Sequence, residues 1–310
     1  MNNSTSSLGT KADVYARVTD RIIEDLNAGV RPWMKPWSAG KSGASLSRPL
    51  RHNGTPYRGI NVLLLWGEAQ AKGLGSPTWM TYRQANELGA QVRKGEAGSL
   101  VVYAARYTLG ETDERGNEAE REVAFMKGYT VFNVEQIDGL PTQYAPPAEP
   151  LPALPATHGK HEAAQAFFAA TGARFCHGGD RAFYAPSRDL IQLPLPEAFV
   201  DAQSYAATKA HELIHWTGHA ERNAREFGQR FGDRAYAFEE LVAELGAAFL
   251  CADLGITPEV RADHAAYLAH WLEVLKEDKR AIFSAAAHAQ RAVDHLRDLQ
   301  PASNGEQLAA

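Results

Sequence analysis

The sequence predicts an α+β protein built from two domains, and three observations support this. A proline-rich stretch at 139–156 indicates an extended spacer, because proline disrupts helices and inner strands. Short helices mix with β-favouring runs before it, whereas helical patterns dominate after it. The 310 residues, 45% of them hydrophobic, exceed what one core usually needs. We therefore expect an N-terminal domain at 1–138, the spacer, a C-terminal domain at 157–300 and a tail at 301–310.

The N-terminal domain is expected to be a mixed α/β module. Residues 11–28 predict an amphipathic helix, since apolar residues recur at helical spacing from Val14 to Leu26. Two more helices and three strands follow from patterns of the same kind. The helices are expected at 60–72 and 81–90, and the strands at 99–107, 121–127 and 128–134.

The C-terminal domain is expected to be mainly helical, with a β-hairpin near its start. At 182–194, β-favouring runs flank the turn sequence Pro-Ser-Arg-Asp, which predicts a hairpin over 181–194. Gly218 is expected to end the next helix, because glycine is favoured just past a helix C-terminus. The helices are expected at 160–171, 202–217, 235–253, near 258–276 and at 279–299.

The helix at 202–217 contains His-Glu-Leu-Ile-His, a HExxH motif. A helix turns ~100° per residue, so His211 and His215 lie on one face and can reach a single divalent ion. Neutral imidazole is a good zinc ligand, and three protein ligands leave a fourth position for a water. Glu212 is placed to accept a proton from that water. An edge strand just before such a helix is where zinc peptidases hold an extended substrate, so the hairpin strengthens the prediction of a metal-hydrolase centre.

A third ligand must come from elsewhere, and four residues are candidates. His219 lies ~12 Å beyond the first histidine along a straight helix. Glu221 occupies the place of the last histidine in HExxHxxGxxH metallopeptidases, where a carboxylate is chemically acceptable. Glu240 and Glu244 share one face of the next, strongly apolar helix, and buried carboxylates need a partner such as a metal.

Charge is distributed unevenly along the chain. Residues 1–110 contain 14 Lys+Arg and 7 Asp+Glu, a net charge of +7, whereas the rest contains 18 basic and 30 acidic residues, a net charge of −12. A basic segment indicates a polyanionic partner, because phosphate contacts release counterions. Interleaved aromatic residues favour single-stranded nucleic acid, whose bases can stack on them. The candidate DNA-binding residues are Arg31, Trp33, Lys35, Trp37, Tyr57, Arg58, Trp79, Tyr82, Arg83, Arg93 and Lys94.

Some of these aromatic residues have a second interpretation. Tyr57, Trp66 and Trp79 are also what the core of a small α/β domain would contain, and scattered Lys and Arg residues are normal on a solvated face.

Several runs resemble the ArdC family of antirestriction proteins. The runs HELIHWTGH at 211–219 and EELVAELGAAFLCADLGI at 239–256 resemble its zincin-like domain, which also occurs with the TraC-type primases of conjugative plasmids. The runs RPWMKPW at 31–37, YRGIN at 57–61 and PTWMTY at 77–82 resemble its N-terminal domain, which binds single-stranded DNA.

The resemblance implies a gluzincin-like metal site and an antirestriction function. In gluzincins the ligand glutamate is followed four residues later by an acidic group that orients a ligand histidine. This makes Glu240 the third ligand and Glu244 its outer partner, with the reverse assignment still open. The expected ion is Zn²⁺, and Mn²⁺ also suits two histidines with a carboxylate.

The implied function is binding of single-stranded DNA and protection of incoming plasmid DNA from host restriction. The alternatives are a DNA-directed metalloprotease with a protein or peptide substrate, and a primase accessory in which the metal is structural. Without a signal sequence or a run of ~20 apolar residues, a cytoplasmic protein with no membrane partner is expected. Cys176 and Cys251 are expected to be buried free thiols. The histidines of the last two helices, His264, His270, His288 and His295, are expected to be structural.

Overall fold

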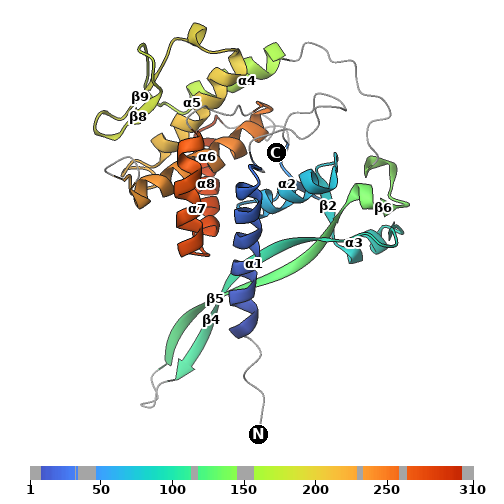
Figure 1. The fold of residues 1–310 in the computed structure, drawn as a ribbon. Helices are drawn as coiled ribbons and strands as arrows, with labels where there is room; N and C mark the ends of the chain where they lie inside the picture. The colour runs from blue at the N-terminus through green and yellow to red at the C-terminus, as the bar shows by residue number, and fades with distance from the viewer. Residues whose placement is uncertain are drawn as a thin grey trace, which may run out of the picture. The chain divides into compact units, whose positions relative to one another are not determined.

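The computed structural model describes residues 8–31, 33, 47–112, 118–144, 157–228, 233–257 and 264–301. The chain divides into two compact units, the first comprising residues 1–28 and 49–146, and the second comprising residues 29–48 and 147–310 (Figure 1). The predicted domains differ from this division, because residues 29–48 belong to the second unit.

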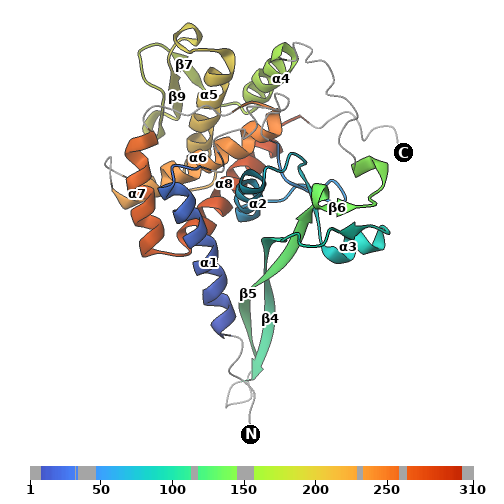
Figure 2. The same ribbon diagram turned by 45° about the vertical axis from the view of Figure 1, so that its right-hand side comes forward.

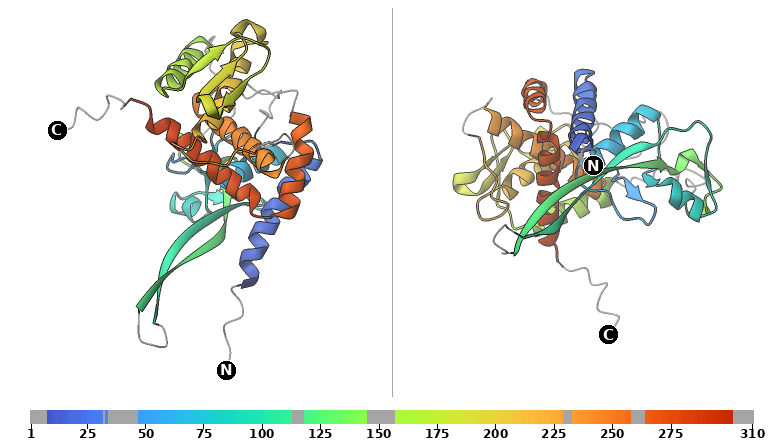
Figure 3. Two further views of the ribbon diagram at one scale, coloured as in Figure 1. Left: turned by 90° about the vertical axis from the view of Figure 1, so that its left-hand side faces the viewer. Right: turned by 90° about the horizontal axis from the view of Figure 1, so that it is seen from below.

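The first unit is built on a mixed sheet with the strand order β1-β2-β5-β4, in which β1 and β2 are parallel and the other pairs antiparallel. β4 and β5 form a long two-stranded ribbon that runs from the pair Ser99 and Val131 to the pair Thr112 and Glu118 (Figures 2 and 3). The strands are β1 Leu50–Arg51, β2 Thr78–Met80, β4 Ser99–Thr112 and β5 Glu118–Asn133.

β5 continues through the point where the sequence predicts a break between two strands. A β-carbon at Gly128 would lie 2.9 Å from Leu100 Cδ1, so the glycine allows a close approach across the ribbon without interrupting it.

Helices and short elements complete the first unit. α2 (Ile60–Lys72) is confirmed residue for residue and ends at Gly73, whose φ of 65° is left-handed. Thr81 and Gln84 form a capping box that starts α3, which is shorter than predicted. The remaining elements are α1 Leu8–Asn27, α3 Tyr82–Glu87, β3 Gln91–Val92, η1 Val134–Gln136, β6 Ile137–Asp138 and η2 Thr142–Tyr144.

The second unit combines a small sheet with a helical core. The sheet has the order β7-β9-β8, so the predicted hairpin is present and β8 lies at an edge. Asp189 ends the turn of this hairpin with a left-handed φ of 45°. The elements are α4 Thr157–Ala170, β7 Phe175–His177, β8 Phe183–Ala185, η3 Pro186–Arg188, β9 Leu190–Leu193, η4 Pro196–Ala198, α5 Ala202–Thr217, α6 Arg234–Leu254, α7 His264–Glu277 and α8 Ala281–Asp298.

Helices α5 and α6 pack closely at the centre of this unit. Leu213, Ile214 and Leu245 are fully buried. A β-carbon at Gly246 would lie 2.9–3.0 Å from side-chain atoms of Ile214, so this glycine allows the two helices to approach. Both helices are buried along most of their length, as expected for helices in a core.

Residues 29–48 join the second unit through buried contacts. Trp33 is 0% exposed, and its ring centroid lies 6.4 Å from that of Trp271. Arg48, also buried, forms an ion pair with Asp253 at 3.1 Å and donates a hydrogen bond to Gln290 Oε1 at 2.9 Å. The prediction that Trp33 stacks on DNA bases is wrong for this structure, because a fully buried ring presents no face to a base.

The two cysteines are unpaired, but only Cys251 is buried as expected, and Cys176 is exposed. Burial, together with the nearby carboxylates of Glu244 and Asp253, raises the pKa of the Cys251 thiol to about 12. Within the described part of the chain, each helix is too short or too polar to span a bilayer.

Trp33→Ala is expected to lower the free energy of unfolding by about 3–5 kcal/mol, because it leaves a cavity in a packed core. Tyr82→Ala serves as a control, because its ring is 47% exposed, and a change within about 0.5 kcal/mol is expected. Chemical denaturation of the full chain measures both. A Trp33→Ala variant with unchanged stability and weakened DNA binding would contradict the assignment of this ring to the core.

Candidate metal centre

α5 carries the HExxH motif between two well-defined ends. The side chain of Asp201 accepts hydrogen bonds from the backbone N–H of Ser204 at 2.7 Å and from its hydroxyl at 2.8 Å, which caps the first turn. Gly218 ends the helix as predicted, but for a different reason. Its φ of −76° is ordinary, whereas a β-carbon there would lie 2.7 Å from Phe227 Cζ and 2.9 Å from Arg225 Nη2. Lack of space therefore requires glycine at this position.

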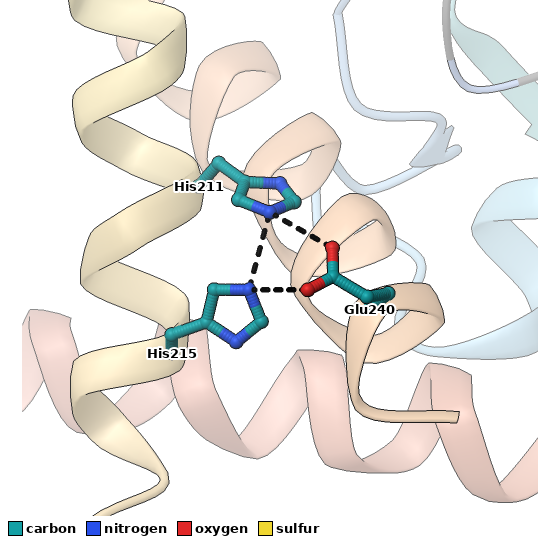
Figure 4. Close-up of side chains that lie close together, drawn as sticks. All are labelled: His211, His215 and Glu240. Atoms are coloured by element: carbon teal, nitrogen blue, oxygen red, sulfur yellow. Dashed lines mark hydrogen bonds and ion pairs between the residues drawn. The ribbon is translucent and has the colours of Figure 1, made fainter. Parts of the chain in front are cut away.

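Three side chains from α5 and α6 converge on one point (Figure 4). The Nε2 atoms of His211 and His215 are 3.2 Å apart. Glu240 places Oε2 at 3.5 Å from His211 Nε2 and Oε1 at 3.5 Å from His215 Nε2. The three side chains are between 7% and 13% exposed.

The spacing of these atoms fits a divalent metal. Zinc binds histidine nitrogen and carboxylate oxygen at about 2.0–2.2 Å, and tetrahedral geometry then separates any two ligand atoms by about 3.3 Å. The observed separations are 3.2 to 3.5 Å. Among the described residues, His211, His215 and Glu240 are the group with metal-ligand spacing.

The other candidate ligands lie elsewhere. Glu244 Oε2 is 3.7 Å from His211 Nδ1, on the side of the ring that faces away from Glu240, so it occupies the outer position that the resemblance implies. Glu221 is exposed, and its backbone N–H donates a hydrogen bond to His219 Nδ1 at 3.3 Å. Neither Glu221 nor His219 belongs to the cluster.

Glu239 is a site residue that the sequence interpretation missed. Its Oε1 lies 3.0 Å from His215 Nδ1, the ring nitrogen that faces away from the cluster. A ligand histidine commonly hydrogen-bonds a carboxylate through its second nitrogen, which holds the ring in position. The adjacent pair Glu239 and Glu240 is visible in the sequence. However, neighbours on a helix point ~100° apart, so the sequence alone does not place both at one site.

Arg225 holds Glu239 in place. Arg225 Nε and Nη2 donate to the two carboxylate oxygens, each at 2.9 Å, and both side chains are nearly fully buried. The guanidinium also donates to Thr217 Oγ1 at 2.9 Å and to the carbonyl of Ile214 at 2.6 Å, which satisfies groups at the end of α5. The residues Arg225, Glu239 and His215 thus form a buried chain of hydrogen bonds that ends at the three-residue cluster.

The electrostatics of the cluster favour a bound cation. Burial acts to raise the pKa of Glu240, but His215 and His211 outweigh it and hold that pKa well below its ordinary value. Burial acts to lower the pKa of His215, but Glu240 and Glu239 outweigh it and raise that pKa to about 10. A divalent ion would take the place of this proton, because an imidazole must be neutral to bind metal.

The cluster opens into a cavity of about 410 Å³. Glu212, 3% exposed, lines it beside the histidines, and Tyr236 lines it from α6. Residues 180–184, which include part of edge strand β8, form another part of the lining. The cavity thus brings a metal site, a carboxylate and an edge strand together.

Arg222 connects the hairpin to the end of α5. Its guanidinium forms an ion pair with Asp189, and its Nη2 also donates to the Tyr184 hydroxyl at 3.1 Å. The guanidinium carbon lies 3.9 Å from the ring centroid of Trp216 in α5. These contacts fix β8 relative to the metal-bearing helix.

The candidate DNA-binding residues fall into buried, exposed and undescribed groups in the structure. Tyr57 and Trp79 are 7% and 1% exposed, which favours their interpretation as core residues, and Trp66 is 2% exposed. Arg31 is half-buried and belongs to the second unit. Lys35 and Trp37 lie outside the described residues. The exposed candidates are Arg58, Tyr82, Arg83, Arg93 and Lys94.

The charge asymmetry does not coincide with the folded units. The first unit contains 13 basic and 15 acidic residues, a net charge of −2, and the second contains 19 and 22, a net charge of −3. Residues 29–48 carry four basic residues into the second unit, and residues 111–146 add eight acidic residues to the first. The predicted basic N-terminal half is therefore a property of the linear sequence alone.

Glu240→Ala is expected to abolish binding of a divalent ion, because it removes the only carboxylate of the three-residue cluster. At a metal concentration 100 times the Kd, wild type should gain about 2.7 kcal/mol in free energy of unfolding, and the variant should gain none. Titration calorimetry and thermal melts measure the two effects. Glu221→Ala is the control. Full metal binding by Glu240→Ala, with loss in Glu244→Ala or Glu221→Ala, would show that a different carboxylate is the ligand.

Glu239→Gln is expected to weaken metal binding by about 10- to 100-fold, because it weakens the hydrogen bond that orients His215. Metal affinity is measured on folded protein, with circular dichroism to confirm the fold. Glu221→Gln makes the same chemical change at an exposed position and should retain wild-type affinity. Equal affinities of the two variants would exclude a positioning role for Glu239.

Comparisons with known proteins agree with this geometry. Residues 12–132 match the family model for the N-terminal domain of the anti-restriction factor ArdC, and residues 162–288 match that for a zincin-like metallopeptidase. A protein of Sinorhizobium fredii named as the uncharacterized protein y4eC is 42% identical over 94% of both chains. A DNA primase TraC of Escherichia coli is 40% identical over 92% of this chain, which spans only 27% of the primase.

Crystal structures of the antirestriction protein ArdC from plasmid R388 are similar to this structure. The metal-free form is 48% identical with a TM-score of 0.76, and the match covers 93% of this chain and 97% of that one. The Mn(II)-bound form is 46% identical with a TM-score of 0.74 and covers 92% and 97%. With both domain types matched and these relatives aligned along nearly their whole length, the chain belongs to the ArdC family of antirestriction proteins.

Proposed function

We propose that this protein binds single-stranded DNA and protects incoming plasmid DNA from host restriction, and that its metallopeptidase-like domain holds a divalent ion. The observation that carries the proposal is the alignment with the ArdC protein of plasmid R388, which extends over 97% of that chain. The site of action would be the cytoplasm of a cell that donates or receives the DNA.

His211, His215 and Glu240 would hold the ion. Zn²⁺ is our first choice because the ligand spacing suits tetrahedral coordination, and Mn²⁺ is the second because an R388 ArdC structure contains Mn(II). When bound, such an ion supplies a Lewis acid and acidifies a water. Glu212, a buried carboxylate on the cavity wall, would accept a proton at its carboxylate oxygen.

The first unit would contribute the contacts with DNA. Arg58, Tyr82 and Lys94 are exposed members of the set proposed from the sequence. Arg83 and Arg93 are exposed as well, but they form ion pairs with Glu87 and Glu96 that phosphates would have to replace. Contact with phosphates would make affinity fall steeply as salt rises.

A metalloprotease acting on DNA-bound proteins is the second candidate. The cavity favours it, because an extended peptide could add to edge strand β8 and reach Glu212 and the ion. A third candidate, a primase accessory with a structural metal, is favoured by the TraC relatives. In that role the site would need no proton acceptor.

Glu212→Gln separates these candidates. We expect it to keep the fold, the metal and the protection of transferred DNA, while any peptide hydrolysis is lost. Arg58→Ala/Lys94→Ala is expected to reduce protection, because it weakens contacts with DNA. The measurement is survival of transferred DNA in a restricting host, beside peptide hydrolysis. Loss of protection in a folded, metal-loaded Glu212→Gln protein would overturn the proposal in favour of the protease.

A further inference from the structure

Two exposed tyrosines lie side by side on the β4–β5 ribbon. Tyr103 in β4 is 53% exposed and Tyr129 in β5 is 41% exposed, although both are large aromatic residues. Their ring centroids are 6.5 Å apart, and the rings meet edge to face at 80°. Single exposed aromatic residues are common, but an adjacent pair on one strand ribbon forms a surface that a flat ligand can use.

The register of the ribbon places a lysine on the same surface. Tyr103 pairs with Lys127, and Val101 pairs with Tyr129, so these four side chains share one face of the ribbon. Val101 is 6% exposed, so the exposed part of this face consists of the two rings and the lysine. Lys127 Nζ lies over the ring of Tyr129, 5.2 Å from its centroid, which adds a cation to the aromatic surface.

The opposite face of the ribbon is used for packing within the first unit. A β-carbon at Gly128 would lie 3.7 Å from Arg17 Nη2 in α1. At the open edge of β4, Asn61 of α2 exchanges two 2.8 Å hydrogen bonds with the backbone of Val102. Helices therefore contact the strands near the tyrosine pair, while the rings themselves remain exposed.

The chemistry of this surface fits single-stranded nucleic acid. An unpaired base exposes a flat π-face that stacks on an aromatic ring, and the phosphate beside it needs a cation. In duplex DNA the faces of the bases are buried within the stack, so few base faces are available to stack on the tyrosine rings. The described residues 111–112 and 118–122, farther along the ribbon, contain four acidic residues and one basic residue, which disfavours a polyanion there and favours it at the end near Lys127.

We propose that Tyr103, Tyr129 and Lys127 form a stacking platform for single-stranded DNA. The two rings would hold bases, and the Lys127 ammonium would contact the phosphate between or beside them. This platform rests on the proposed function, since it assigns a location to the DNA contacts of the first unit. It adds residues that lie outside the set proposed from the sequence.

The test uses the full chain and a fluorescently labelled oligo-dT, with a duplex of the same length as the comparison. Tyr103→Leu/Tyr129→Leu keeps apolar bulk but removes both rings, and it should weaken single-strand binding by about tenfold or more. Tyr103→Phe/Tyr129→Phe keeps the rings and should restore affinity to within about threefold of wild type. Lys127→Gln should reduce the dependence of log affinity on log salt by about one unit.

Two failures are distinguishable. If wild type does not bind the oligonucleotide, the proposed function fails. If wild type binds and the double leucine variant binds equally well, the platform is wrong while the function stands. Circular dichroism checks the fold of each variant, and ultraviolet cross-linking of wild type to the oligonucleotide followed by mass spectrometry needs no variant. Cross-links elsewhere in the first unit and none at Tyr103 or Tyr129 would overturn the proposal. It would also be overturned if wild type were a dimer and the double leucine variant a monomer, because the tyrosine pair would then be a contact between two copies of the chain.

Discussion

The burial of two adjacent carboxylates on a core helix is the constraint on which the metal centre depends. Glu239 and Glu240 lie on α6, most of whose buried residues are apolar, and a buried charge is stable only when it is paired. Arg225 neutralises Glu239, whereas Glu240 faces the two histidines of α5. The core can accept this helix because each carboxylate has its own positive partner, and for Glu240 a divalent ion is the partner that best suits the geometry.

Close packing of α5 and α6 determines the distances between Glu240 and the two histidines. Gly246 allows the helices to approach, and Glu240 of α6 then lies 3.5 Å from each of the two histidines of α5. Arg225 and Arg222 secure the chain after α5, one to α6 and the other to the hairpin. The candidate metal ligands, Glu212 and edge strand β8 all line one cavity within the second unit.

The two units differ in how strongly their structure indicates a ligand. In the second unit a buried cluster has the spacing that metal ions require. In the first unit the indication is an exposed surface formed by Tyr103, Tyr129 and Lys127. Its two aromatic rings and its positive charge suit a flexible single strand of DNA better than a rigid duplex. Net charge contributes little, because both units are slightly acidic once residues 29–48 are counted with the second.

The sequence by itself determined the features that depend on near neighbours in the chain. The HExxH motif places two histidines on one helical face, Gly218 ends that helix, and α2 follows from apolar spacing. Family membership was also readable, since its motifs are local runs. Tertiary structure decided what depends on contacts between distant residues. It brought Glu240 to the two histidines and Arg225 to Glu239, and it buried Trp33 against Trp271. Which side chains meet depends on how helices pack and not on their spacing in sequence.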